Sequence, residues 1–462
     1  MGGLGVKKHF FNNPNKKGGI LSYNRLPYIV YTLIKNQIMT ITSKEFLKNH
    51  KLRSSDIDTD DLVRIFTEDM NLGLEGKEGA LRMIPTYIEA ENDFITDTPV
   101  LAIDAGGTNF RASLISITGS GKVETGNTVN YRMPGLEGEI SSKEFFTTIA
   151  DYIRPLASKV DRIGFCFSYP TEILPDRDGR LLQLCKEVQA REVEGQLIGK
   201  NLLETLGSPG KKIVLLNDTV ATLLAGKSAS IGRSYDSFIG YILGTGTNTC
   251  YIEKNSNILK NKQLNQNKSQ IINIESGDFG RPPRTALDIL FDNTTTNPGS
   301  YKFEKMFSGG YFGGLCLFVL KAAAAEGVFS DKTARGIYNI AELASWDANA
   351  YVAEQVTHEN PLVQSVINSN DAESCKYIID TLTDRAAKLV AASMSSVILK
   401  CGKGRSPEKP ILITVEGTTF YKLHNFRSRF ELYLNEYLTG DKKCHFEFTE
   451  VAQSSLIGAA LA

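Results

Sequence analysis

VLLNDTVAT, residues 214–222, is the stretch that decides the fold of this 462-residue chain. Branched apolar residues run up to Leu216 and stop at the pair Asn217-Asp218, and a helix-forming segment begins directly after Thr219. This change of pattern predicts a buried strand followed by a helix, with the carboxylate of Asp218 at the corner between them. Such corners line ligand clefts in α/β proteins, but an isolated Asn-Asp-Thr is more typical of a simple helix cap. The neighbouring motifs therefore decide between the two interpretations.

Two similar hairpins flank this corner in the sequence. Residues 100–117, VLAIDAGGTNFRASLISI, and residues 238–253, FIGYILGTGTNTCYIE, each predict a strand, a glycine turn and a second strand. The triplet GTN at residues 107–109 recurs at residues 246–248, which indicates a duplicated unit whose hairpins face one bound phosphate chain from opposite sides. Many Gly-Gly turns are only structural, yet paired glycines let backbone N–H groups approach an anion. Asp104, at the end of the first strand, can hold a water-shelled Mg²⁺ beside it.

Other predicted strands also end in polar residues. Ser168 follows the apolar strand at residues 163–167, and Glu275 ends the strand at residues 271–275. A helix that starts at residues 297–299, NPG, is expected to present Glu304. These ends supply hydroxyl and carboxylate oxygens, the groups that bind sugar hydroxyls.

Further segments complete the expected organisation. We expect a mainly helical N-terminal region at residues 43–89 and a surface loop at residues 254–270. Long helices are expected at residues 315–325 and 372–399, and a strand with a glycine turn at residues 411–417. Residues 221–228, ATLLAGKS, imitate a loose Walker A motif. This match is rejected, because the strict motif needs a glycine first and a loop, whereas this segment consists of helix formers.

Length and composition limit the class of protein. A chain of 462 residues is too long for one hydrophobic core, so at least two domains with a cleft between them are expected. The formal net charge of +0 gives no electrostatic reason to expect nucleic acid or a membrane surface as a partner. No apolar run approaches the roughly 20 residues of a membrane span. Seven cysteines without a C-x-x-C spacing are typical of reduced thiols, so a cytoplasmic protein is expected.

Residues 1–38 are basic and polar, with no acidic residue before Glu45. A transit peptide has such a charge, but this stretch is poor in Ser and Arg, and Met39 opens a more ordinary protein-like start. We therefore expect a dispensable, disordered extension that joins no core.

From about Met70 to the C-terminus, these motifs resemble, in order, the hexokinase family within the superfamily of sugar kinases, actin and heat-shock chaperones. The first hairpin looks like the family's phosphate loop, and residues 216–222 look like its catalytic corner. The sugar-binding segments are similar to residues 167–170 and 181–186, and further matches lie at residues 244–251, 273–280, 298–305 and 415–422.

The resemblance implies an α/β fold: the two-domain, duplicated actin-like (ribonuclease H-like) ATPase fold with a central cleft. Residues 39–97 and 217–444 would form the large domain, and residues 98–216 and 445–462 the small one. The implied reaction moves the γ-phosphoryl group of ATP to the 6-hydroxyl of a hexose such as glucose, and the domains close on the sugar. Closure excludes water, the competing acceptor. The implied partners are hexose, ATP and Mg²⁺, without nucleic acid or membrane, in a monomer or homodimer.

The resemblance also implies residue roles. Asp218 would be the base and Lys186 a second catalytic residue, which suits phosphoryl transfer, a reaction that depends on positioning and charge neutralisation. The implied sugar contacts are Ser168, Cys185, Lys186, Asn217, Asp218, Asn248, Glu275 and Glu304. The implied nucleotide contacts are Asp104 (which would also hold Mg²⁺ through water), Gly106, Gly107, Thr108, Asn109, Arg111, Thr245, Gly246, Gly417 and Thr418.

The chain departs from the family pattern at four places. Residues 184–187 read LCKE where Trp-Thr-Lys-Gly is usual, Tyr301 replaces a common Gln, Glu416 replaces an Asp, and QSSL at residues 453–456 stands where Gly-Ser-Gly is usual. A weakly active or inactive hexokinase-like sugar sensor is therefore the alternative, and an actin-like or chaperone-like ATPase is the third interpretation. Retention of the catalytic residues argues against the sensor, and the sugar-binding segments argue against the ATPase.

Overall fold

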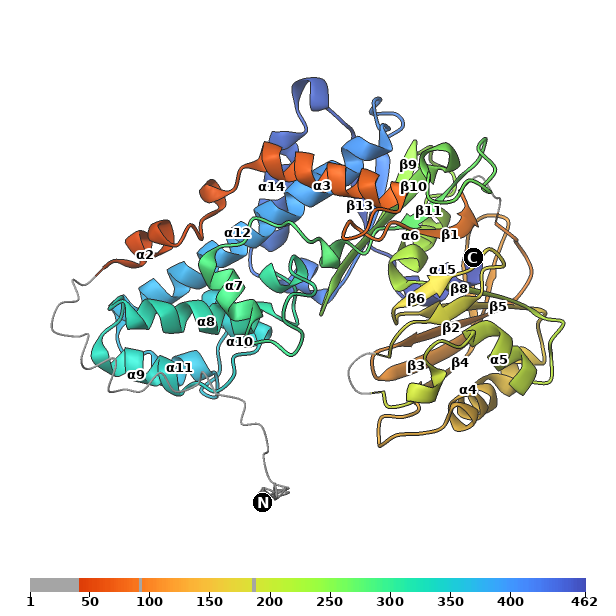
Figure 1. Cartoon of the computed structure of the whole chain (residues 1–462), viewed down its shortest axis with the longest axis horizontal. Helices are drawn as coiled ribbons and strands as arrows, with labels where there is room; N and C mark the ends of the chain where they lie inside the picture. Colours follow the sequence, from red (N-terminus) through yellow and green to blue (C-terminus); the bar gives the residue numbers. More distant parts are fainter. Residues whose placement is uncertain (1–40, 91–93, 185–187) are drawn as a thin grey trace, which may run out of the picture.

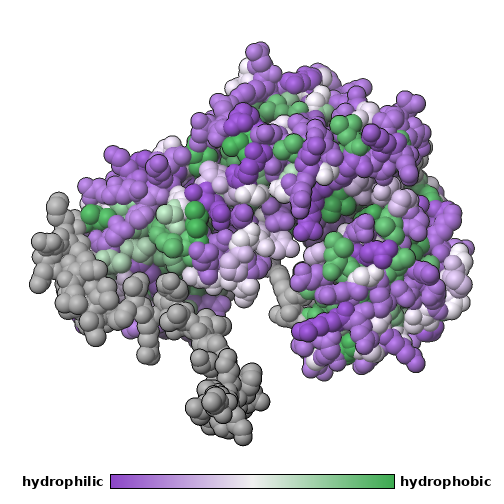
Figure 2. All heavy atoms as spheres, in the orientation of Figure 1, coloured by the Kyte–Doolittle hydropathy of each residue, from purple (hydrophilic) through white to green (hydrophobic). Residues whose placement is uncertain are grey.

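The computed structural model describes residues 41–90, 94–184 and 188–462, which form two lobes, each around its own β-sheet (Figure 1). The extension predicted at residues 1–38 and the candidate residues Cys185 and Lys186 lie outside the described residues. Within the described ranges, no helix has both the length and the apolar character needed to cross a membrane. Figure 2 shows a mostly hydrophilic surface on both lobes.

The smaller lobe contains a five-stranded sheet in the order β4-β3-β2-β5-β8. Its strands are β2 (Val100–Gly106), β3 (Asn109–Ile117), β4 (Val123–Arg132), β5 (Arg162–Phe167) and β8 (Lys212–Leu216). Strand β5 lies between β2 and β8 and is parallel to both, and its apolar residues are buried, as expected for a strand covered on both faces. The helices α4 (Ser142–Ala157) and α5 (Ile198–Thr205) and the short hairpin of β6 (Thr171–Ile173) and β7 (Gly179–Leu181) complete this lobe.

The larger lobe contains a six-stranded sheet in the order β1-β11-β10-β9-β12-β13. Its strands are β1 (Ile84–Glu89), β9 (Ser237–Leu243), β10 (Thr247–Lys254), β11 (Ser269–Asn273), β12 (Ile411–Glu416) and β13 (Phe446–Thr449). The predicted boundary at residue 445 assigned the segment of β13 to the small domain, whereas β13 pairs with β12 in this sheet.

Apart from the added edge strand β1, the two sheets have the same topology. The order β11-β10-β9-β12-β13 repeats β4-β3-β2-β5-β8, with antiparallel pairing on one side of β9 or β2 and parallel pairing on the other. The recurring GTN triplet lies at the same hairpin in both halves. The duplication predicted from that triplet is therefore present in the fold.

Two helices cross between the lobes. Helix α6 (Asp218–Ala229) follows β8 of the smaller sheet and packs on β9 and β12 of the larger one. Helix α15 (Ser454–Leu461) follows β13 of the larger sheet and packs on β2 and β5 of the smaller one. The two helices pack on each other so closely that a Cβ on Gly458 would lie 2.0 Å from the carbonyl oxygen of Ala221. The corner at Asn217-Asp218 thus lies at the junction of the lobes.

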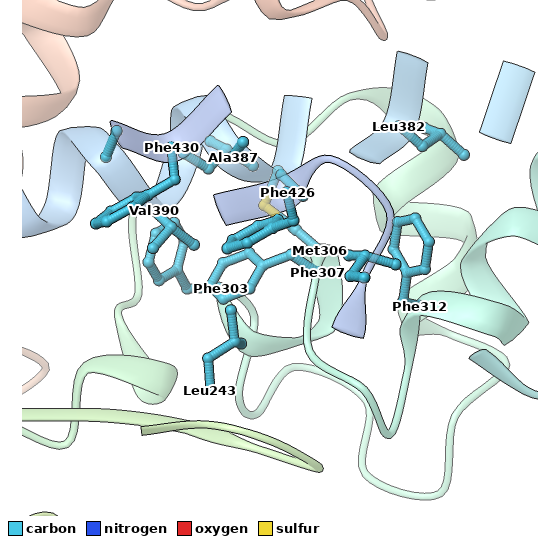
Figure 3. Packing of buried hydrophobic residues seen from close by; sticks show 14 of the residues in the cluster. Leu243, Phe303, Met306, Phe307, Phe312, Leu382, Ala387, Val390, Phe426 and Phe430 are labelled. Atoms are coloured by element: carbon cyan, nitrogen blue, oxygen red, sulfur yellow. The ribbon is translucent and has the colours of Figure 1, made fainter. Parts of the chain in front are cut away.

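Most of the remaining helices cover the larger lobe (Figure 1). Helix α12 (Ser369–Cys401) packs against both α3 (Thr59–Glu75) and α14 (Phe426–Tyr437). Both long helices predicted from the sequence are present, as α8 (Phe312–Ala325) and α12. The others are α2 (Ser43–Asn49), α7 (Ala286–Asp292), α9 (Asp331–Asn339), α10 (Ser345–Val352), α11 (Pro361–Ser365) and α13 (Thr418–Lys422). Figure 3 shows the aromatic core of this lobe, where Phe303, Phe307, Phe426 and Phe430 pack near Leu243 of β9.

Two sequence predictions of helix are wrong. Residues 84–89 form the edge strand β1, which pairs antiparallel with β11 and tolerates Pro85, a residue without a backbone donor. Glu304 begins only a short 3₁₀ turn, Glu304–Met306, because Gly299 (φ 84°) and Tyr301 (φ 51°) adopt left-handed conformations that interrupt a helix.

Other predictions from the sequence hold. The segment that imitates a Walker A motif lies inside helix α6. Residues 254–270 link β10 to β11, mostly as an irregular segment. The described cysteines are free thiols, all buried except the partly exposed Cys401.

Candidate active site

At the start of α6, one residue caps the helix and the next carries the candidate catalytic carboxylate. Asn217 is the N-cap residue, and its Oδ1 accepts a hydrogen bond of 2.9 Å from the backbone N–H of Thr219. Asp218 Oδ1 accepts from the same N–H at 2.7 Å and from the Thr219 hydroxyl at 3.2 Å. Among the described residues, no hydrogen bond is found to Asp218 Oδ2. Asn217 supplies the helix cap, so Asp218 Oδ2 is not needed for capping and can contact a substrate.

Burial is the main cause that raises the pKa of Asp218, and the charges of Glu275 and Glu416 also raise it. Against the opposing hydrogen bonds from Thr219, the pKa comes to about 6. The side chain is only partly accessible, at the end of a strand whose last residues are buried. A carboxylate with this pKa is mostly ionised at neutral pH and is a stronger base than an ordinary aspartate. Asp218 is therefore suited to take a proton from a hydroxyl group.

A chain of amide hydrogen bonds connects the corner to Glu275. Asn248 Nδ2 donates to Asn217 Oδ1 at 3.3 Å and to Asn273 Oδ1 at 2.8 Å, and Asn273 Nδ2 donates to Glu275 Oε1 at 2.7 Å. Asn217, Asn248 and Glu275 are each half-buried, whereas Asn273 is buried. Burial also raises the pKa of Glu275. These hydrogen bonds join three predicted sugar contacts, Asn217, Asn248 and Glu275, in one polar group.

Glu304 reaches the same group from the other side. Its Oε2 accepts a hydrogen bond of 2.8 Å from the backbone N–H of Thr247, next to Asn248. A Cβ on Gly246 or on Gly277 would lie 2.7 Å or 2.9 Å from that oxygen, so both glycines leave room for the carboxylate. The backbone at Tyr301, three residues before Glu304, is held in place because its N–H donates a hydrogen bond of 3.2 Å to Asp278 Oδ1.

Ser168 follows β5 and lies against the first hairpin, where a Cβ on Gly106 would be 3.0 Å from its own Cβ. A small cavity is lined by Phe167 and Tyr169, the sequence neighbours of Ser168, and by Asn217, Asn273 and Glu275 of the amide group. The segments that carry Ser168, Asn217 and Glu275 therefore meet at one cavity.

The first hairpin carries the charged part of the site. Asp104 Oδ2 accepts hydrogen bonds from Arg111, directly opposite on β3, and from the Ser455 hydroxyl at 2.9 Å. Pairing of Gly106 with Asn109 leaves the exposed or half-buried turn of Gly107 and Thr108 between the strands. A shallow cavity beside the turn is lined by Asp104, Gly106, Asn109 and Arg111, with Phe110, Asn130 and Tyr131.

The donor set fits a water-shelled magnesium ion. Among the described residues, no group of three or more acidic, His or Cys side chains could coordinate a metal directly. Mg²⁺ is commonly held by one or two carboxylates while it keeps several waters and binds substrate phosphates. Asp104 is the carboxylate at the glycine turn that meets this description.

Two glycine turns meet where the adenosine was predicted. Gly417 has φ 122°, and a Cβ there would lie 2.2 Å from the carbonyl oxygen of Leu243. The Gly244 carbonyl accepts from Thr419 Oγ1 and from the Gly309 N–H, both at 2.8 Å. Beside these two glycine turns, two threonines are exposed: Thr245, which follows Gly244, and Thr418, which follows Gly417.

Sequence reasoning missed three residues of the site. Asn273 joins Asn248 to Glu275, and its only signal was a polar residue inside an apolar strand. Ser454 donates to Glu416, which also accepts from Thr222 Oγ1 at 3.3 Å, and Ser455 binds Asp104. The two serines come from the QSSL segment, where only a departure from the family pattern was noted.

Comparisons with known proteins agree over both lobes. Two models of the hexokinase family, each described as Hexokinase, match residues 43–228 and residues 238–462. Hexokinase-3 of Rattus norvegicus is 31% identical over 419 residues, 85% of this chain and 44% of the relative. Hexokinase-1 of Schizosaccharomyces pombe is 28% identical over 424 residues, 86% of this chain and 85% of the relative. The chain thus spans about 44% of the length of the rat relative.

The fold agrees as well. A hexokinase from Schistosoma mansoni complexed with glucose has a TM-score of 0.71 and 22% sequence identity, with 91% of this chain and 99% of that chain covered. This likeness confirms the predicted two-domain, duplicated actin-like α/β fold. The two family models, which match the sequence along both lobes, show that the chain belongs to the hexokinase family.

Proposed function

We propose that this protein is an ATP-dependent hexose kinase that transfers the γ-phosphoryl group to the 6-hydroxyl of a hexose such as glucose. The observation that supports the proposal most is Asp218, whose pKa is raised to about 6 at the junction of the lobes. The hydrogen-bonded group of Asn217, Asn248 and Glu275 adjoins it. A base beside several amide and carboxylate hydrogen-bonding groups suits a polyhydroxylated acceptor.

In this proposal each side chain has a separate task. Asn217, Asn248, Glu275 and Glu304 orient the hexose through its hydroxyl groups, and Asp218 accepts the proton of the 6-hydroxyl as it attacks. Ser168 adds a hydroxyl from the smaller lobe. The resemblance assigns sugar contacts to Cys185 and Lys186 and a catalytic role to Lys186, and both residues lie outside the described part of the chain.

The nucleotide would lie between the two glycine turns. Backbone N–H groups at Gly107 and Thr108, with Arg111, bind phosphate oxygens, while Thr245 and Thr418 flank the adenosine. Mg²⁺, held through water by Asp104, would neutralise charge on the β- and γ-phosphates. Rotation of the smaller domain, residues 98–216 with α15, toward the larger one would exclude water from the acceptor side.

A coupled assay with ATP and glucose, fructose, mannose, glucosamine and N-acetylglucosamine tests the proposal. We expect turnover with at least one hexose and a product phosphorylated at the 6-position, as read by ³¹P and ¹³C NMR. ATP hydrolysis that sugar does not stimulate would instead support the actin-like or chaperone-like ATPase.

The second candidate is a weakly active or inactive sugar sensor. It is favoured by the two donors on Asp104 Oδ2, Arg111 and Ser455, which compete with the waters of a metal ion. Calorimetry distinguishes the two functions. A sensor binds glucose with an affinity that MgATP does not change and shows no turnover, whereas a kinase binds both ligands and forms product.

A further inference from the structure

A buried charge cluster lies directly behind Glu304. Asp292, the last residue of α7, is 4% exposed, and Lys305 is 2% exposed. Lys305 Nζ donates to Asp292 Oδ1 at 2.6 Å, and Arg284 Nη1 donates to Asp292 Oδ2 at 3.0 Å. Burial by itself would raise the pKa of Asp292, but the hydrogen bonds from Lys305 and Gly299 hold it below its ordinary value.

This cluster fixes the backbone that leads to Glu304. The Gly299 N–H donates to both oxygens of Asp292, at 3.2 Å and 3.1 Å, and Lys305 Nζ also donates to the carbonyl oxygen of Asn297 at 2.7 Å. The middle of the segment between α7 and Glu304, at Gly299, and the residue that follows Glu304, Lys305, are therefore both tied to the carboxylate of Asp292. We call Asp292, Lys305, Arg284, Asn297 and Gly299 the Asp292 clamp.

The residues on either side of Glu304 and Lys305 are packed in the core, which limits movement of the turn that carries Glu304. Phe303 and Phe307 on either side of the 3₁₀ turn are 1% and 0% exposed and stack edge to face with centroids 4.8 Å apart (Figure 3). Lys305 points into the lobe, whereas its neighbour Glu304 bonds the Thr247 N–H at the site. Adjacent residues thus connect a buried ion pair to a half-buried candidate ligand.

We propose that Asp292 and Lys305 are positioning residues for the sugar site, which hold the carboxylate of Glu304 at the place where it binds a hexose hydroxyl. The inference rests on the proposed function, because it takes Glu304 as a sugar ligand. A buried ion pair is weak evidence for stability, since desolvation offsets the attraction, so a role in positioning is a better reason for this one.

Helix α7 supplies a matched control one turn earlier. Asp288 is 4% exposed and forms a buried ion pair with Arg385 of α12, with hydrogen bonds of 2.9 Å and 2.7 Å. This pair has the same burial and the same helix as the clamp, but it ties α7 to α12 and does not reach Glu304. Loss of either carboxylate leaves a buried cation unpaired, so both changes should lower stability.

The test measures glucose affinity by calorimetry and the KM for ATP in the full-length protein. Asp292→Asn should raise the glucose dissociation constant at least about tenfold and leave the ATP KM within about twofold, because one charge-assisted hydrogen bond is misplaced. Asp288→Asn should lower the melting temperature but leave the glucose affinity unchanged. An equal loss of glucose affinity in both variants, or in neither, would overturn the inference.

A double-mutant cycle separates positioning from a general loss of structure. Once Glu304→Gln has removed the carboxylate, Asp292→Asn should reduce glucose affinity by less than about twofold further. Full additivity of the two changes would show that Asp292 does not act through Glu304.

A milder variant covers the case in which Asp292→Asn does not fold. Gly299→Ala places a Cβ in open space but strains the left-handed turn of the clamp, and Gly402→Ala applies the same strain at the end of α12. Only the first should weaken glucose binding, by about threefold or more. If wild-type protein binds no hexose, the proposed function itself fails; if it binds glucose and turns over while these variants match it, only the positioning role fails.

Discussion

The two halves of the molecule share a topology but differ in chemistry at matched positions. When the GTN triplets are aligned, Asp104 of the first hairpin corresponds to Leu243 of the second, and Leu243 is completely buried under the aromatic core (Figure 3). The first turn has the two residues Gly107 and Thr108 between the paired strands, and the second has three, residues 244–246. The first hairpin thus has a partly exposed carboxylate, Asp104, beside its turn, and the second has a buried apolar residue, Leu243, at the matching position.

The crossing helices differ in the same way. Helix α6 begins at Asp218, a carboxylate, whereas α15 begins at Ser454 and Ser455, two hydroxyl groups. The serines bind carboxylates of both lobes, Glu416 and Asp104. Duplication therefore supplies a symmetrical frame, and at these two matched places the first half carries a carboxylate where the second carries a leucine or serine hydroxyl groups. This division predicts that nucleotide and sugar functions can be damaged separately, except at the corner that both halves share.

The largest effect is expected at that shared corner. Asp218→Asn keeps a hydrogen-bonding side chain but cannot accept a proton, so kcat should fall by about two to four orders of magnitude while glucose still binds. Single-turnover phosphoryl transfer and calorimetric glucose binding check both parts. Unchanged turnover would leave Asp218 with the role of a structural residue at the start of α6.

A paired experiment tests the division between the halves. Asp104→Asn should lower kcat/KM for MgATP about ten- to hundredfold and leave glucose affinity unchanged, since charge-assisted contacts are lost only on the nucleotide side. Glu275→Gln should weaken glucose by a similar factor and leave the ATP KM unchanged. The comparison would break down if each variant altered both ligands equally.

The pH dependence of turnover is expected to follow the shared corner. Because the base must be deprotonated, kcat should fall as pH falls through about 6, the raised pKa of Asp218. The charge of Glu416 contributes to that rise, so Glu416→Gln should move the acid limb to lower pH. Thr222→Val, which removes one donor to Glu416 without changing its charge, is the control and should leave the limb near its wild-type position.

The sequence predicted the parts of the molecule that depend on local signals. Both hairpins, the corner at Asp218 and the long helices α8 and α12 follow from runs of branched apolar residues, glycine turns and helical periodicity. The resemblance to hexokinases predicted Asn217, Asn248 and Glu275 as sugar contacts, and the structure joins these three residues in one hydrogen-bonded group, while their role stays a prediction.

The parts that the sequence did not predict depend on distant partners or on unusual backbone. Strand β1 exists because β11, almost 190 residues later, offers it an edge, with Ile84 opposite Asn273. The helix expected at residue 297 is replaced by a turn in which Gly299 and Tyr301 are left-handed, and no propensity marks Tyr301 for that conformation. Ser455 meets Asp104 across 351 positions of sequence, a contact that only the crossing of α15 explains.

The smallest effect expected is on stability, and it has the opposite sign to the loss of activity. The pKa of Asp218 in the folded protein, about 6, lies above the ordinary aspartate value of 3.8, so the folded state favours the protonated form. The stability linked to this group is fully present below the unfolded pKa and is lost as pH rises through about 6. Asp218→Asn removes that cost and should stabilise the protein by about 1–3 kcal/mol at pH 8, with little change at pH 4. Denaturant unfolding at the two pH values checks this, with Asp104→Asn as the control. Because Arg111 pairs with Asp104, removal of that charge should give no gain at pH 8. Equal stabilisation by both variants would mean that the strain at the corner is general repulsion among carboxylates, which both halves would then share.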